Sequence, residues 1–211
     1  MIYIISASAV LHRQRATGKD RLVSRITPLP YSDARPEVQR VYDRVERRYG
    51  RSLDPVMVTA HSTPIFDGYI AFESGMQHTA HLEQRLVELV STKVAAMIGC
   101  AFCIDLGSFL SQERGVTERQ ILEMADYATS DAYTQRERLA FDYAIAMSGG
   151  RVEVADDLFQ RLGQEFTTGE LVELTAVIAW ENYRSRFNMA LGMDSHGFSD
   201  GRTCALPERA H

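Results

Sequence analysis

Two cysteines three residues apart, Cys100 and Cys103, are the side chains of this 211-residue chain best suited to chemistry. On one helix an i,i+3 pair shares a face, and its sulfurs lie close enough to form a disulfide with modest local adjustment. Gly99 directly precedes the pair, and a helix break there would place both thiols near a new helix N-terminus. A helix start favours the thiolate, the nucleophilic form of cysteine. The pair predicts dithiol chemistry, and the alternative is two small buried core residues.

Three other residues are candidates for a part in such chemistry. Glu88 stands twelve residues before Cys100 and would accept or relay a proton if it lined the same cavity, although such a residue is more often a solvated position on a helix. Arg184 would favour the thiolate if its helix turned it toward the sulfur. Cys204 lies in the C-terminal tail, where it is either incidental or, if the tail folds back, an alternative resolving thiol.

Zinc binding is the main competing hypothesis for the cysteine pair. His78 and His81, taken with Cys100 and Cys103, would give a Cys₂His₂ donor set. Against this set, His81 lies just where a helix is expected to begin. No Ser-His-Asp grouping, phosphate loop or nucleotide fingerprint occurs in the sequence. We therefore expect neither a metal ion nor another cofactor.

Helical patterns dominate the elements that must position these residues. Apolar side chains recur every three or four residues over 36–49, and Gly50 ends that pattern. Further helices are expected at about 64–77, 82–98 and 100–114. Capping boxes introduce the later helices at Thr117-x-x-Gln120, Thr134-x-x-Glu137 and Thr167-x-x-Glu170. Because convincing period-2 alternation is absent, the sequence predicts an all-α domain of about seven or eight helices, with 82–98 and 100–114 as the central pair.

Composition and charge narrow the classes of partner. The formal net charge is −5 and basic residues are interleaved with acids, which argues against a nucleic-acid role. No apolar run approaches the about 20 residues of a membrane span, and the first residues lack the features of a signal peptide. We expect a cytoplasmic protein with no nucleic-acid or membrane partner. Residues 1–24 show no clear period and are interpreted as an N-terminal extension before a domain at 25–211.

The stretch around the cysteines resembles the redox members of the AhpD-like alkylhydroperoxidases, in the carboxymuconolactone decarboxylase superfamily. The shared motif is Glu88-x(11)-Cys100-x-x-Cys103, with glycine before the first cysteine and an aromatic residue before the second. The resemblance extends over most of residues 25–206. It includes Leu-Val-Glu-Leu-Thr at 171–175 and Glu-Asn-Tyr-Arg-Ser-Arg-Phe-Asn-Met-Ala-Leu-Gly at 181–192.

The resemblance implies an AhpD-like helical fold, a homo-oligomer, and reduction of hydroperoxides in antioxidant defence. It implies that Cys103 attacks the peroxide to give a sulfenic acid, and that Cys100 resolves this acid as a disulfide. Glu88 would be the first member of a proton relay. An external dithiol reductant or a thioredoxin-like protein would then reduce the pair again. The family fold provides no zinc site.

Two positions depart from the family pattern. Gly107 stands where the family usually has a histidine four residues after the second cysteine, and Phe102 replaces the histidine that some members carry between the cysteines. Slow peroxide turnover is therefore expected, unless Arg184 or His78 substitutes for the imidazoles, while dithiol chemistry remains. The alternatives are a non-catalytic or redox-sensing ligand-binding member of the fold and, less favoured, a carboxymuconolactone-type decarboxylase, because the founding decarboxylases generally lack the cysteine pair.

Overall fold

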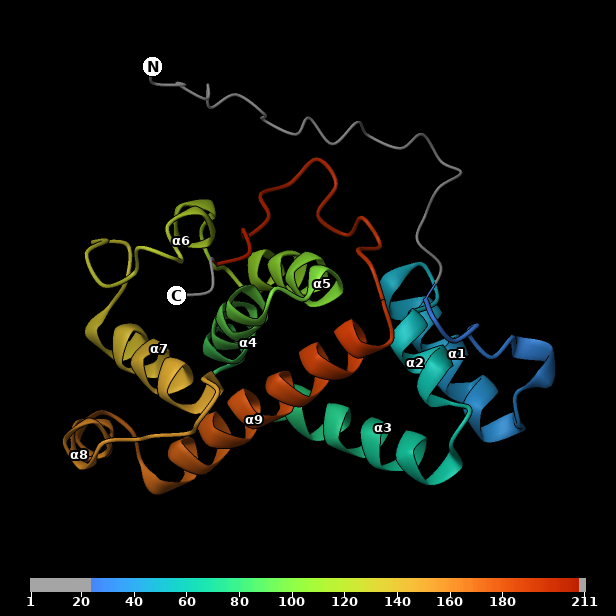
Figure 1. The fold of residues 1–211 in the computed structure, drawn as a ribbon, viewed down its shortest axis with the longest axis horizontal. Helices are drawn as coiled ribbons and strands as arrows, with labels where there is room; N and C mark the ends of the chain where they lie inside the picture. Colours follow the sequence, from blue (N-terminus) through green and yellow to red (C-terminus); the bar gives the residue numbers. More distant parts are fainter. Residues whose placement is uncertain (1–23, 209–211) are drawn as a thin grey trace, which may run out of the picture.

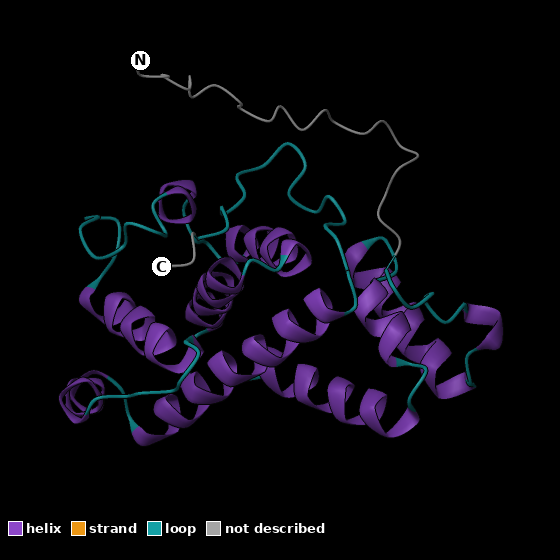
Figure 2. Ribbon diagram, in the orientation of Figure 1, coloured by secondary structure: helices purple, strands orange, loops and turns teal. Residues whose placement is uncertain are grey.

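The computed structural model describes residues 24–208 as helices joined by loops (Figures 1 and 2). Within this range there is no strand, and nine α-helices follow a short 3₁₀ helix, η1, at Tyr31–Asp33. The helices are α1 (Pro36–Tyr49), α2 (Asp54–Thr59), α3 (Thr63–Gln77), α4 (Gln84–Ile98), α5 (Ala101–Glu113), α6 (Glu118–Leu122), α7 (Gln135–Ser148), α8 (Asp156–Glu165) and α9 (Thr168–Ala190). The all-α prediction is confirmed. The proposed N-terminal extension lies outside the described residues, except for Ser24.

Two of these helices, α2 and α8, are additional to the predicted set. They begin after Leu53 and Ala155, whose side chains make no capping hydrogen bond. By contrast, the capping boxes predicted at Thr117, Thr134 and Thr167 all form. The starts of α1, α3 and α4 also lack a capping side chain, but their apolar periodicity over 14 or 15 residues predicted them. The shorter helices α2 and α8 have neither a capping box nor so long a repeat, so the sequence did not indicate them.

The helices α4 and α5 occupy the centre of the fold, as predicted for residues 82–98 and 100–114 (Figure 1). α4 packs against α5, α7 and α9. Its side chains Leu86, Leu89 and Val94 are at most 1% exposed. Since burying one such side chain contributes about 2 kcal/mol, α4 is the helix whose packing most strongly fixes its neighbours.

A glycine turn joins the two central helices. Gly99 has a φ of 84°, in the left-handed region that strains any residue with a Cβ. The chain then enters α5 directly, with Cys100 as the N-cap residue. The cysteine pair therefore lies at the junction of α4 and α5, in the middle of the fold.

The long helix α9 crosses the centre, with α3 beside it, α1 and α2 to one side, and α7 and α8 to the other (Figure 1). Aromatic contacts join α3 to α9, since the Trp180 ring lies 5.3 Å from that of Tyr69 and 4.5 Å from that of Phe72, centroid to centroid. No helix in the described part of the chain is both long and apolar enough to span a bilayer.

The C-terminal segment 193–208 folds back across α5 and α4. The carboxylate of Asp105 accepts hydrogen bonds of 2.7–3.0 Å from the backbone N–H groups of His196, Phe198 and Ser199. Further along, the N–H of Glu208 donates to the carbonyl of Ala96 at 2.9 Å. Asp105 is only 4% exposed, so these bonds compensate the carboxylate for its lost hydration.

Candidate functional site

A cavity of about 610 Å³ opens beside the cysteine pair, and residues of α1, α2, α3, α4, α5 and α9 line it. Much of its wall is apolar or aromatic, including Phe66, Tyr69 and Trp180. Cys103 and Glu88 both line it, so Glu88 shares a cavity with the cysteine pair, as a proton carrier must. A cavity of this volume is ordinary for a small-molecule site.

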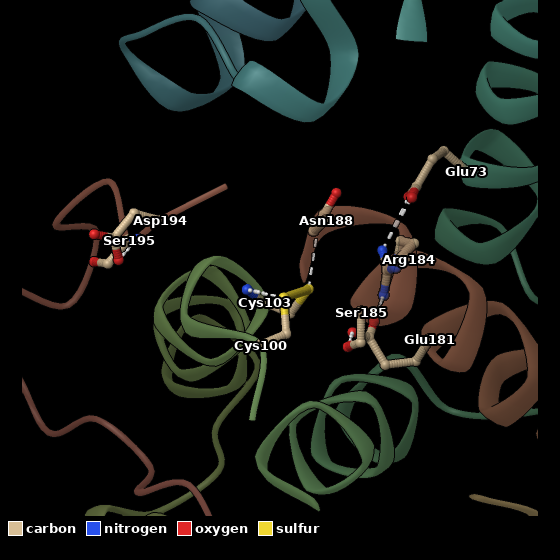
Figure 3. The surroundings of a disulfide bond; sticks show 9 residues. All are labelled: Glu73, Cys100, Cys103, Glu181, Arg184, Ser185, Asn188, Asp194 and Ser195. Carbon is tan, nitrogen blue, oxygen red and sulfur yellow. Dashed lines mark hydrogen bonds and ion pairs between the residues drawn. A yellow bond between two sulfur atoms is a disulfide. The ribbon is translucent and has the colours of Figure 1, made fainter. Parts of the chain in front are cut away.

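Cys100 and Cys103 form a disulfide at the start of α5, with their Cα atoms 5.3 Å apart (Figure 3). Cys100 has no exposed surface, and its sulfur accepts a hydrogen bond from the N–H of Cys103 at 3.2 Å. Cys103 is 8% exposed and lines the cavity, whereas Cys100 does not. The two sulfurs are therefore inequivalent, and Cys103 is the one that a molecule in the cavity would meet.

Asn188 supplies a hydrogen-bond donor to the Cys103 sulfur. Its Nδ2 lies 3.3 Å from Sγ (Figure 3), and its side chain is buried in the last turn of α9. An N–H directed at the sulfur stabilises the charged form more than the neutral form. Sequence reasoning missed Asn188 as a site residue, because it stands 85 positions from Cys103 and no local spacing connects the two.

Arg184 lies one helical turn before Asn188 and is held by two carboxylates. It donates to Glu73 of α3 at 3.0 and 3.2 Å, and also to Glu181 (Figure 3). Burial by itself would lower the pKa of Arg184, but Glu181 and Glu73 raise it well above its usual value. Arg184 is thus a permanent cation in the cavity wall. Among the described residues it hydrogen-bonds to neither sulfur, so any effect of Arg184 on the thiol acts at a distance.

Glu88 is half-buried in the cavity wall, and no described group hydrogen-bonds to its carboxylate. Burial raises the pKa of Glu88 to about 7, against the opposing effects of Arg184 and Arg114. At neutral pH this group is therefore divided between its acid and carboxylate forms. That division suits a group that both accepts and returns a proton.

At Gly107, where the family usually has a histidine, close packing of α4 against α5 leaves no space for a larger side chain. A Cβ on Gly107 would lie 2.8 Å from Oγ1 of Thr92 on α4. The Thr92 hydroxyl is itself 3.0 Å from Oγ of Ser111, and both residues are buried. Because α4 and α5 approach so closely here, position 107 has no room for an imidazole unless the helices move apart.

Phe102, the second departure from the family pattern, does have an imidazole beside it. The ring of His196, from the C-terminal segment, meets the Phe102 ring edge to face, with centroids 5.0 Å apart. Its Nε2 lies 3.3 Å from Oδ2 of Asp54. His196 does not line the cavity, so it packs against the first turn of α5 and does not face a bound molecule. The sequence gives no signal for this contact.

The four candidate zinc ligands do not come together. Nδ1 of His78 lies 2.7 Å from the carbonyl oxygen of Ser74, while the ring of His81 packs against Gly169. In residues 24–208, no group of three or more His, Cys, Asp or Glu side chains is arranged to hold a metal ion. His78 does line the cavity. Cys204 is a free, half-buried thiol on the folded-back C-terminal segment.

Comparisons with known proteins concern the family and the fold of the chain. The model of the carboxymuconolactone decarboxylase family matches residues 64–146, which include Glu88 and both cysteines of the pair. The uncharacterized protein YnjA of Escherichia coli (strain K12) is 33% identical over 164 residues, which are 77% of this chain and 87% of YnjA.

Two solved structures extend the comparison to three dimensions. A protein of unknown function from Agrobacterium tumefaciens, described as a candidate antioxidant defence protein AhpD, has a TM-score of 0.61 and 27% identity, over 64% of this chain and 92% of that one. The debrominase Bmp8 has a TM-score of 0.73 and 21% identity, over 85% of this chain and 94% of Bmp8. The likeness to Bmp8 concerns the fold alone.

Proposed function

The chain belongs to the carboxymuconolactone decarboxylase family, and from that premise we propose that it is a thiol-dependent oxidoreductase of the AhpD-like alkylhydroperoxidase type. Its proposed substrates are hydroperoxides, reduced by the Cys100–Cys103 pair. The observation that carries the proposal is the setting of Cys103, whose sulfur lines the cavity and accepts a hydrogen bond from Asn188.

The proposed cycle starts from the reduced pair. The Cys103 thiolate attacks the terminal oxygen of ROOH, the O–O bond breaks, and the alkoxide leaves as ROH after taking a proton. Cys103 is then a sulfenic acid, and the Cys100 thiol displaces water from it to form the disulfide. The Cα atoms of the two residues are 5.3 Å apart, within the range that a disulfide requires.

Glu88 is the proposed proton carrier of this cycle. As a carboxylate it takes the proton of the Cys103 thiol, and as an acid it returns a proton to the leaving alkoxide. Its pKa of about 7 allows both steps at neutral pH. An external dithiol or a thioredoxin-like protein then supplies two electrons and two protons, which reduce the disulfide to two thiols.

The thiolate is favoured here without the relay histidine. Asn188 donates to the sulfur, and the start of α5 contributes its dipole. Because the space at Gly107 is closed by Thr92, we expect peroxide reduction to be slower by about 10²–10⁴ than with a positioned imidazole.

A homo-oligomer in the cytoplasm is part of the same proposal. Several large apolar side chains of α3 and α9 that remain partly exposed support the oligomer, among them Phe72, Tyr183 and Met189, which are 39–45% exposed. Association with a second copy would remove such surface from water. Light scattering of the purified protein gives the mass of the assembly directly.

A second candidate reaction is the reductive removal of halogen from an aromatic ring. The structural relative Bmp8 is a debrominase, and a cysteine-to-alanine variant of Bmp8 holds 2,3,4-tribromopyrrole. The aromatic side chains Phe66, Tyr69 and Trp180 in the cavity wall favour this alternative, because they fit a flat ring. The dithiol would supply two electrons, giving an aromatic C–H bond, halide, a proton and the disulfide.

Stopped-flow measurement of cumene hydroperoxide consumption by the reduced protein tests the proposal. We expect one peroxide consumed per chain, with mass spectrometry identifying a Cys100–Cys103 disulfide. Cys100→Ser should trap a sulfenic acid on Cys103, and Cys103→Ser should be inert. Cys204→Ser, the matched control, should behave as the wild type. If peroxide is not consumed but 2,3,4-tribromopyrrole loses bromide, the second reaction replaces the first.

A further inference from the structure

The mouth of the cavity carries three arginines that the proposed reaction does not use. Arg44 and Arg48 are one turn apart on α1, and both line the cavity together with Val41 and Val45. Arg114, at the C-terminal end of α5, lines it too and lowers the pKa of Glu88 against the effect of burial. All three arginines are exposed, so they stand where the cavity meets solvent.

These arginines have no anionic partner in residues 24–208, although carboxylates line the same cavity. Four of the five lining carboxylates are bound to other arginines: Glu37 to Arg40 at 3.2 Å, Asp67 to Arg35 at 2.6 Å, and Glu73 and Glu181 to Arg184. Only Glu88 remains, and it is in part protonated at neutral pH. The mouth of the cavity is therefore positively charged, with guanidinium groups free to bind an anion.

The wall beyond these arginines is largely apolar and aromatic, although Glu88 and the Arg184 cluster with Glu73 and Glu181 also line it. Val41 and Val45 continue the α1 wall inward, and the indole of Trp180 lies in the wall formed by α9. Arg48 is placed over the ring of Tyr49, 5.4 Å from its centroid, and Tyr49 also lines the cavity. A ligand that satisfies both regions needs one anionic group and an apolar body.

We propose that the cavity binds amphiphilic carboxylic acids, with the carboxylate held by Arg44, Arg48 and Arg114 and the apolar body directed inward toward Cys103. Guanidinium groups suit this role because they bind carboxylates through two parallel hydrogen bonds. An uncompensated positive mouth also raises the local concentration of anions. The inference rests on the proposed function in one respect, since it makes hydroperoxides of such acids the preferred substrates.

The chain contains its own probe for this binding, because Trp180 is its single tryptophan and lines the cavity. The test titrates the oxidised wild-type protein with 6-phenylhexanoate and with the neutral isostere 6-phenylhexanamide, and follows the tryptophan fluorescence. We expect the acid to bind about tenfold more tightly than the amide, and the difference to shrink as salt is added.

Single substitutions assign the preference to residues. Each of three variants should bind the acid more weakly and the amide nearly as well as the wild type does, so that the preference for the acid falls: Arg44→Gln, Arg48→Gln and Arg114→Gln. Arg47→Gln is the matched control, since Arg47 is exposed in the same last turn of α1 but does not line the cavity.

Three results would overturn the proposal: equal affinities for acid and amide, the same loss in Arg47→Gln as in the three test variants, or no binding of either compound by calorimetry at about 1 mM. No peroxide is present in these titrations, so none of these results bears on peroxide reduction. Conversely, a protein that prefers the acid but does not consume peroxide would refute the peroxidase proposal and leave the carboxylate site intact.

Discussion

The amide nitrogen of Asn188 lies 3.3 Å from the sulfur of Cys103, although 85 residues separate the two in sequence. The contact joins the last turn of α9 to the first turn of α5, and both helices pack against α4. Helix packing therefore fixes the donor, which is also buried and cannot turn freely to solvent. The sulfur that faces the cavity is thus paired with a preorganised N–H group.

Replacing this donor should make Cys103 less reactive. Asn188→Ala removes a hydrogen bond of about 1 kcal/mol to the thiolate, so alkylation of reduced Cys103 by iodoacetamide at pH 7 should slow about fivefold. The measurement is made in a Cys100→Ser, Cys204→Ser background, where Cys103 is the single thiol. Asn182→Ala is the control, because Asn182 lies on the same helix but donates to Ser148. Equal rates for the two variants would show that the contact does not activate the sulfur.

The rate of peroxide reduction should depend on the ionisation of Glu88. Because the pKa of Glu88 is about 7, the carboxylate that takes the thiol proton forms as pH rises through that value, and the rate should rise with it. Glu88→Gln should remove this inflection and lower the rate by about 10² or more. Glu83→Gln, at the exposed N-cap of α4, should keep the wild-type profile. An unchanged profile in Glu88→Gln would assign the inflection to another group.

The same group should make stability depend on pH with a definite sign. Burial raises the pKa of Glu88 from 4.5 to about 7, so between these values the folded state binds more protons than the unfolded state. The free energy of unfolding therefore falls as pH rises from 4.5 to about 7, and stays lower above that pH. For this half-buried group the loss should be about 1–3 kcal/mol. In urea unfolding, Glu88→Gln should match the wild type near pH 4.5 and exceed it at pH 8; the opposite order would contradict the burial argument.

The ion pair between Arg184 and Glu181 should contribute to the stability of the fold. Arg184→Gln leaves Glu181 unpaired at 2% exposure, so the free energy of unfolding should fall by about 3 kcal/mol. Adding Glu181→Gln should recover part of this loss, because no charge then remains buried at that position. The control is Arg186→Gln on the same helix: Arg186 is exposed and bonds to Asn182 and the Ser148 carbonyl but to no buried carboxylate, so its loss should change the free energy by less than about 1 kcal/mol. If Arg184→Gln is as mild as the control, the pairing contributes little.

Packing at Gly107 gives a further test. Gly107→Ala places a methyl group 2.8 Å from Oγ1 of Thr92, so it should lower the free energy of unfolding by about 1–3 kcal/mol, despite the better helix propensity of alanine. In a Thr92→Ala background the obstructing hydroxyl is absent, and the cost should largely disappear. Urea unfolding of the two single variants and the double variant measures this coupling. Strictly additive effects would mean that the cost of Gly107→Ala does not arise from its contact with the Thr92 hydroxyl.

Much of the fold was determined by the sequence alone, because its signals are local. Capping side chains at Thr117, Thr134 and Thr167 satisfy the N–H groups of the turns that follow them, and Gly99 permits the left-handed turn between the central helices. The Cys-x-x-Cys spacing likewise predicted that Cys100 and Cys103 lie close enough to bond. Each signal depends on residues within one turn of each other, so tertiary contacts are not needed to interpret it.

The site was decided by tertiary structure. The spacing of the pair does not distinguish Cys100 from Cys103. The packing of α5 against α4 and α9 does, because it buries Cys100 completely and leaves Cys103 in the wall of the cavity. The raised pKa of Glu88 comes from burial by segments distant in sequence, and the approach of Asn188 depends on where α9 ends over α5. Such contacts follow from how helices pack around one core. The periodicity of one helix predicts which of its faces is buried, but it does not predict which other helix packs against that face.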